Sequence, residues 1–162
     1  FLNIDFIEST FYPFAMIGWF VYFFFIFYSM NEKEKLNGKF VGYLIFDLEK
    51  VIAGEKEFRL SEIQKFEFTY SDFDGKKWVN FRSPDPKVSN GINNRVTIKF
   101  KNGDPLEFFF YQDYEDEFRM KMKDLLIDYH RQDKISFLAL IQYIGISDDY
   151  ERIQEFKKKL YS

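Results

Sequence analysis

The sequence predicts an α+β protein in which an N-terminal apolar helix precedes an antiparallel sheet and a group of C-terminal helices. Three observations predict it. Residues 9–31 form a run of 23 positions without a charged side chain. Short segments with apolar residues at alternating positions follow, separated by turn signals. The last third of the chain has apolar residues at helical spacing instead, and strands followed by helices are typical of the α+β class.

The composition sets limits on function. The chain has 162 residues, enough for one soluble domain with additional segments, and a formal net charge of −3. A near-neutral chain has no electrostatic reason to bind DNA or RNA, so we expect no nucleic-acid partner. The absence of cysteine excludes a disulfide scaffold, thiolate catalysis and a zinc site with cysteine ligands.

The uncharged run is long enough to cross a bilayer. As a helix it would extend about 34 Å, and the hydrocarbon core of a bilayer is about 30 Å thick. It lacks the polar stripe of a surface helix, and tyrosines lie near both ends, where membrane interfaces favour them. We predict a transmembrane helix over residues 11–30, with Pro13 in its first turn. The predicted anchor side chains are Tyr12, Phe14, Ile17, Trp19, Phe20, Phe23, Phe24, Phe27 and Tyr28.

Three other interpretations of this run compete with a membrane span. A cleaved signal peptide would begin with basic residues, whereas two acidic residues precede the run here. A buried core helix would be shorter, and an interfacial helix would have a polar face. The positive-inside rule gives the orientation, because Lys33, Lys35 and Lys39 follow the run and no Lys or Arg precedes it. We therefore expect residues 1–10 outside and a cytoplasmic C-terminal domain.

Strands are predicted after a polar linker at residues 31–39. A first hairpin pairs a strand at 40–48 with a second at 51–60. Residues 65–70 alternate with period two, which is typical of a half-buried strand. A further strand is predicted at 78–81, and the Pro-, Gly- and Asn-rich residues 83–94 are predicted to form a long loop.

A second hairpin and three helices complete the prediction. Residues 95–101 alternate, Asn102-Gly103 is a strong turn signal, and a strand returns over 106–110. Phe109 and Tyr111 occupy its outer face, which we expect to be covered. The helices are predicted at 114–130, at 136–143 with Gly145 as its stop, and at 148–160 with Ser147 as its N-cap.

This pattern resembles the pleckstrin-homology-like (PH-like) fold, specifically bacterial PH-like domains attached to membrane helices. The resemblance implies an antiparallel sheet or barrel capped by a helix over residues 40–131, with 132–162 as a helical extension. It also implies a location in the bacterial inner membrane. The features that carry it are the hairpin at 40–60, the step from Leu60 to Phe66 into the third strand, the turn at Lys101–Asp104 and the helix Phe118–Tyr129.

No motif for catalysis or cofactor binding is present in the sequence. His130 is the only histidine, and a catalytic triad or a His-based metal site needs partners that one histidine does not supply. Asp72, Asp74 and Gly75 partly match a calcium loop, but Ser83 occupies the position of the required acid, so we expect a turn. There is no phosphate-binding glycine motif. We expect no cofactor, no metal and no small-molecule substrate.

Contact with anionic lipid is the one ligand interaction that the sequence suggests. PH domains that bind phosphoinositides use a basic first hairpin loop, whereas residues 47–50 have mixed charge, so specific inositide binding is not expected. Lysines near an anionic membrane contribute about 1 kcal/mol each. The run at 157–159 is alternatively the solvated face of a helix. The candidate lipid contacts are Lys33, Lys35, Lys157, Lys158 and Lys159.

Two functions follow as hypotheses. The first is a non-enzymatic accessory or scaffold subunit of a membrane complex, in which the PH-like domain binds a protein partner or a second copy of the chain. The lack of a catalytic motif and an aromatic content of 22 % favour it. The alternative is a lipid-responsive module that binds anionic lipid at the membrane surface. An enzyme would instead need a pocket lined by carboxylates with perturbed pKa values.

Overall fold

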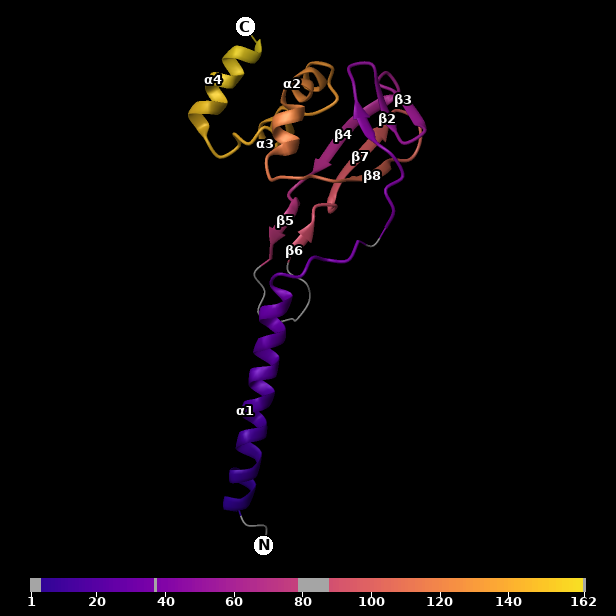
Figure 1. Ribbon diagram of the computed structural model, residues 1–162. Helices are drawn as coiled ribbons and strands as arrows, with labels where there is room; N and C mark the ends of the chain where they lie inside the picture. The colour runs from indigo at the N-terminus through magenta and orange to yellow at the C-terminus, as the bar shows by residue number, and fades with distance from the viewer. Residues whose placement is uncertain (1–3, 37, 79–87, 162) are drawn as a thin grey trace. The chain divides into compact units, whose positions relative to one another are not determined.

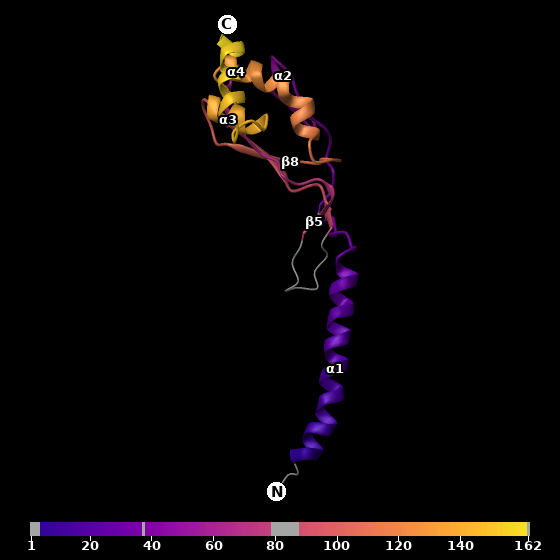
Figure 2. The same cartoon turned by 90° about the vertical axis from the view of Figure 1, so that its left-hand side faces the viewer.

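A computed structural model describes residues 4–36, 38–78 and 88–161, with side chains from residue 12 onward. The chain forms two compact units (Figures 1 and 2). The first unit contains residues 1–36 and 75–90, with α1 (Ile4–Ser29), β5 (Asp74–Lys77) and β6 (Val88–Asn90). The second contains β1 (Leu44–Phe46), β2 (Lys50–Ala53), β3 (Lys56–Arg59), β4 (Ile63–Thr69), β7 (Asn94–Phe100), β8 (Leu106–Phe110), α2 (Glu117–Arg131), α3 (Phe137–Tyr143) and α4 (Tyr150–Tyr161).

Helix α1 is longer than the predicted span. It begins at Ile4, so Pro13 lies inside the helix and not in its first turn, which corrects the prediction. The proline lacks an N–H and removes one backbone hydrogen bond at that point. Within α1, the stretch Tyr12–Ser29 is long and apolar enough to cross a membrane.

The second unit is built on two antiparallel sheets. Their strand orders are β1-β2-β3 and β4-β7-β8, and the central strands β2 and β7 each pair on both sides. In Figures 1 and 2, α2 and α3 lie on the same side of the β4-β7-β8 sheet. The α+β class is thus confirmed. The described strands do not close into one barrel, and the PH-like barrel remains a prediction.

Several strand boundaries differ from the prediction. The strand expected at 40–48 is only Leu44–Phe46, and the strand expected at 51–60 is the hairpin of β2 and β3. Gly54 makes the turn of that hairpin with φ of +61°, a conformation that favours glycine.

The region between β4 and β7 also differs. β5 begins at Asp74, within the acidic segment that was predicted as a turn, and β6 lies within the predicted loop at 83–94. Trp78 belongs to no strand, and residues 79–81 of the strand predicted there lie outside the described residues, as do 83–87. Short polar strands of this kind have no hydrophobic alternation to reveal them.

The core is dominated by aromatic rings that meet on β4. Phe66 stacks on Tyr129 of α2 with ring centres 4.8 Å apart. Phe68 contacts Phe118 of α2 at 5.1 Å and Tyr143 of α3 at 5.4 Å. Aromatic pairs contribute about 0.5–1.5 kcal/mol each beyond the area they bury. These contacts attach both helices to the sheet.

The helical extension also completes one edge of the sheet. Among the described strands, β4 pairs only with β7, so its other edge would be left with unpaired backbone groups. The Phe66 N–H donates to the Lys134 carbonyl at 2.9 Å, and the Phe68 N–H donates to the Tyr143 hydroxyl at 3.0 Å. Lys134 Nζ donates to the Ile63 carbonyl at 2.6 Å. The segment from 132 onward is therefore part of the fold.

The helices follow the predicted order with changes at their ends. α2 begins at Glu117, three residues after the predicted start. α3 is confirmed, and the Ser136 hydroxyl caps it by accepting from the Ala139 N–H at 3.2 Å. The N-cap predicted at Ser147 is wrong, because the Asp149 carboxylate accepts from the Arg152 N–H at 3.0 Å and α4 begins after it.

We expect the buried tyrosines to make the second unit sensitive to alkali. Burial raises the pKa of the Tyr70, Tyr129 and Tyr143 hydroxyls from a usual value near 10. The unfolded chain therefore releases these protons first, and the free energy of unfolding falls as the pH rises above 10. Urea unfolding of the detergent-solubilised chain, followed by near-ultraviolet circular dichroism, measures this.

Two single substitutions separate this effect from general alkaline damage. Tyr129→Phe removes the hydrogen bond to the Asp47 carbonyl at 2.8 Å, and we expect a loss of about 1 kcal/mol at neutral pH. It should also weaken the alkaline loss, whereas the exposed Tyr150→Phe should change neither quantity. Equal pH slopes in the three proteins would contradict the assignment.

Candidate functional site

The predicted anchor side chains all lie on the exposed surface of α1. Their exposed fractions range from 41 % for Phe23 to 72 % for Tyr12. Of the helix residues with described side chains, only Ile26 and Ser29 near the C-terminal end are buried. Soluble monomers rarely expose so large an apolar surface, and the stretch Tyr12–Ser29 is long and apolar enough to cross a membrane.

The chain leaving α1 forms a strand pairing that the sequence did not reveal. Lys33 bridges Val88 of β6 in parallel orientation. The Val88 N–H donates to the Glu32 carbonyl at 3.1 Å, and the Glu34 N–H donates to the Val88 carbonyl at 2.8 Å. Because β6 also pairs with β5, this bridge connects the first residues of the predicted linker to the small two-stranded β5–β6 sheet next to the end of α1 (Figure 1).

This pairing brings two further lysines and a tryptophan to the end of the helix. Lys77 Nζ donates to Asn31 Oδ1 at 3.2 Å. Lys76 Nζ lies 4.5 Å from the centre of the Trp78 ring. The predicted contacts Lys33 and Lys35 are exposed in the same unit. The sequence does not predict that these hairpin residues lie at the end of α1, because only the long-range pairing brings them there.

The predicted lysine run of α4 lies elsewhere. Lys157, Lys158 and Lys159 are exposed and belong to the second unit. They follow α4 through its last turns, where positive charge is favoured by the helix dipole. The structure thus separates the five predicted lipid contacts into two groups in different units.

A second exposed apolar surface lies on the second unit, and we call it the aromatic surface. It consists of a stretch at the start of the first sheet and a stretch on β8, which meet where the Phe40 and Tyr111 rings pack edge to face at 6.3 Å. Phe109 is 70 % exposed, so the described residues of the second unit do not supply the cover expected over this face. The members of the aromatic surface are Phe40, Val41, Tyr43, Ile45, Phe109 and Tyr111.

The charges beside the aromatic surface are paired with one another. Arg95, the residue opposite Phe109 in the register of β7 and β8, contacts Glu107 at 3.2 Å. On the neighbouring strands, Lys99 is bonded to Glu67. These surface pairs leave little net charge along the sheet.

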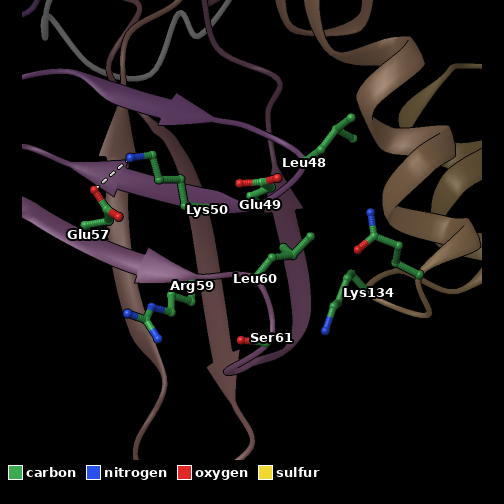
Figure 3. Close-up of a pocket in the computed structure, with 9 residues that line it drawn as sticks. Leu48, Glu49, Lys50, Glu57, Arg59, Leu60, Ser61 and Lys134 are labelled. Atoms are coloured by element: carbon green, nitrogen blue, oxygen red, sulfur yellow. Dashed lines mark hydrogen bonds and ion pairs between the residues drawn. The ribbon is translucent and has the colours of Figure 1, made fainter.

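An open pocket of about 540 Å³ lies between the β2–β3 hairpin and the segment after α2 (Figure 3). Lys50 and Glu57 form an ion pair at 2.9 Å on one side of it. Lys134 lines the other side, and burial, followed by the charge of Lys101, lowers its pKa. The remaining residues that line the pocket are Leu48, Glu49, Arg59, Leu60, Ser61 and Gln132.

The pocket offers mixed charge and no pair of groups suited to nucleophilic catalysis. Ser61 is its only hydroxyl side chain, and no histidine lines it to act as a base. The single histidine of the chain lies at the end of α2, with Nδ1 3.0 Å from the Ile135 carbonyl and Nε2 2.9 Å from the Tyr161 hydroxyl. These contacts connect the end of α2 to Ile135 and to the end of α4, so the histidine has a structural role.

A buried polar cluster joins the ends of β4, β7 and β8. Asn94 Oδ1 accepts from the Ser71 and Asp72 N–H groups at 3.1 and 3.0 Å. Its amide nitrogen donates to the Asp72 and Gly91 carbonyls at 2.9 and 3.0 Å. Gln112 Nε2 donates to Asn94 Oδ1 at 2.9 Å. The side chains of Asp72, Asn94 and Gln112 are nearly inaccessible to solvent. Their burial indicates that the cluster is a structural joint between these strands.

The acidic residues near this joint do not form a metal site in the described residues. No group of three His, Cys, Asp or Glu side chains lies close enough there to hold an ion. The Asp72 carboxylate instead accepts from the Asn93 N–H at 3.0 Å. Of the residues that partly match a calcium loop, Asp72 is thus held by a hydrogen bond within the fold, and Asp74 and Gly75 belong to β5.

Comparison of the chain with protein-family models, curated proteins and solved structures finds no match. The resemblance to membrane-attached PH-like domains therefore stays a prediction. The features of the described residues that point to a function are two exposed surfaces, namely the apolar surface of α1 and the aromatic surface.

We expect Asn94→Ala to destabilise the second unit by about 3 kcal/mol, because it leaves several buried backbone groups without partners. Urea unfolding of the detergent-solubilised chain measures the loss. The matched control is Asn93→Ala, since the Asn93 side chain is exposed and its backbone N–H remains. Similar losses in the two variants would show that the cluster contributes no more than a surface loop.

Proposed function

We propose that this chain is a single-pass, membrane-anchored, non-enzymatic scaffold or accessory subunit, and that its second unit binds a protein partner in a membrane complex. The observation that carries the proposal is the aromatic surface, which is exposed on a unit that has a complete core of its own. Exposed groups of aromatic residues are enriched at protein interfaces.

The anchor is supported by the surface of α1. A stretch of 18 residues that exposes nearly all of its large apolar side chains matches the length and chemistry of a membrane span. The lysines that follow it favour a cytoplasmic second unit. Placed in a bilayer, the helix needs no protein cover along its length.

A protein partner fits the aromatic surface better than a lipid surface does. Anionic membranes attract surplus positive charge, whereas the cations beside Phe109 are already paired with carboxylates. Aromatic rings surrounded by nearly neutral polar groups resemble the core and rim of a protein interface. The partner is accordingly a protein that supplies apolar side chains, with a second copy of this chain as one form of it.

Enzymatic function has little support in the described part of the chain. The polar side chains that lie closest together there, in the cluster around Asn94, are directed at backbone groups and at one another. The pocket beside the β2–β3 hairpin combines an ion pair with a lysine bonded to a carbonyl. These groups hold the fold, and this favours a binding role.

The aromatic surface is tested by serine substitutions that leave the fold intact. We expect Val41→Ser with Phe109→Ser to weaken partner binding at least tenfold, because buried aromatic anchors dominate interface energies. The full chain is isolated from native membranes in detergent, and the stoichiometry of co-purifying protein is measured by quantitative mass spectrometry. Hydrogen exchange of the recovered complex should show protection over 40–45 and 106–111.

The matched control is Leu138→Ser, which changes another strongly exposed apolar residue of the same unit, on α3. It should leave the stoichiometry and the protection unchanged. Recovery of the chain as a monomer, or equal binding by the variants and the control, would contradict the proposed function.

The anchor is tested independently. We expect the full chain to resist alkaline carbonate extraction from membranes with its helix retained, as judged by intact mass. Phe20→Arg with Phe24→Arg should move it to the soluble fraction, because each arginine costs about 2.5–3.5 kcal/mol at the centre of a span. Leu138→Arg with Met120→Arg, outside α1, should have no effect. Loss of the N-terminal segment by cleavage would identify a signal sequence instead.

A further inference from the structure

The small sheet at the end of α1 collects residues suited to the headgroup layer of a membrane. We propose that it is a lipid-binding platform, consisting of Lys33, Lys35, Lys76, Lys77 and Trp78, that contacts the phosphates of anionic phospholipids. The proposal rests on the membrane anchoring of α1 proposed above. Lys76, Lys77 and Trp78 of the hairpin thereby gain a lipid-binding role that their positions in the sequence do not predict.

Backbone hydrogen bonds hold the platform at the helix exit. The pairing of Val88 with Glu32 and Glu34 begins within three residues of Ser29, where α1 ends. A segment that follows a membrane helix this closely lies in the interfacial layer. The hairpin is therefore held at headgroup depth by two backbone hydrogen bonds and does not depend on flexible side chains for its position.

The side chains confirm that the hairpin reaches the helix exit within this unit. Lys77 Nζ is bonded to the Asn31 side chain at 3.2 Å, only two residues beyond the end of α1. Its partner is a neutral amide, so the ammonium keeps its full charge for an anion.

The charge balance of the platform favours anions. Among the described residues that follow α1 in this unit and those of β5, four lysines stand against the carboxylates of Glu32, Glu34 and Asp74, which leaves one positive charge. By contrast, the cations beside the aromatic surface are matched by carboxylates. Surplus cations next to a membrane span are drawn to anionic headgroups.

Trp78 adds a second feature of an interfacial site. Tryptophan is favoured at the boundary between acyl chains and headgroups, where one part of the ring is apolar and its N–H is wet. Lys76 Nζ lies over its ring at 4.5 Å, so the cation and the ring are presented together. Trp78 is 43 % exposed and so retains surface for a lipid.

Trp78 also supplies the measurement, because Trp19→Phe leaves it as the only tryptophan of the chain. The full chain carrying this change is reconstituted into bilayers that contain brominated phosphatidylglycerol or brominated phosphatidylcholine at equal mole fractions. The ratio of Trp78 quenching by the two lipids gives the preference for the anionic headgroup. We expect a clear preference for phosphatidylglycerol that decreases at high salt.

Substitutions then locate the site. Lys76→Gln with Lys77→Gln should lower the preference about fivefold per lysine, which corresponds to about 1 kcal/mol each. Lys33→Gln with Lys35→Gln, on the paired strand, should act in the same direction without altering the hairpin. Lys157→Gln with Lys158→Gln is the matched control with the same charge change, and it should leave the preference unchanged.

The outcomes separate this proposal from the anchor on which it rests. Trp19, observed alone in Trp78→Phe, should be quenched by lipids brominated deep in the acyl chain. If Trp19 is quenched and Trp78 shows no headgroup preference, the platform is refuted and the anchor stands. If the α4 control lowers the preference as much as the hairpin variant does, the site is misplaced. Absence of Trp19 quenching would overturn both proposals.

Discussion

The second unit depends on how the free edge of β4 is completed. This strand carries Phe66 and Phe68 into the core, and its neighbour on one side is β7. On the other side no described strand pairs with it, and the Lys134 carbonyl and the Tyr143 hydroxyl accept its N–H groups instead. The same α2–α3 segment that closes the edge thus brings aromatic rings onto the inner face. Tyr143 contributes to both, because its hydroxyl accepts from the Phe68 N–H and its ring packs edge to face on the Phe68 ring.

In the first unit, a single backbone pairing likewise brings together segments that are far apart in the chain. A backbone pairing at Val88 joins the exit of an apolar helix to a hairpin more than forty positions later in the chain. This pairing fixes the first residues of the predicted linker to β6 through one bridge, and Lys77 lies against Asn31. Restricting the chain directly after a membrane helix holds its charged groups at one depth, where the contribution of each charge to lipid binding is greatest.

Charge pairing distinguishes the two candidate surfaces. Beside the aromatic surface, cations and carboxylates neutralise each other, so the free energy available there comes from burying rings, which a protein partner with apolar side chains provides. At the helix exit, positive charge exceeds negative charge and the exposed ring lies under a lysine, which suits a headgroup layer. A scaffold at a membrane has use for both, since the lipid contacts would orient the helix exit and the aromatic surface would engage the partner.

The sequence by itself determined the features that local physics controls. The uncharged run around Trp19 predicted the apolar helix, period-two alternation predicted β4, β7 and β8, and Ser136 predicted the start of α3. Tertiary structure alone decided the β5–β6 hairpin, the joint around Asn94 and the closure of the β4 edge. Each of these depends on backbone or amide hydrogen bonds between segments far apart in the chain, and such bonds leave no periodic pattern in the residues that make them. The apolar helix could therefore be predicted from residue order, whereas the lysines of the hairpin acquired a common location only through long-range pairing.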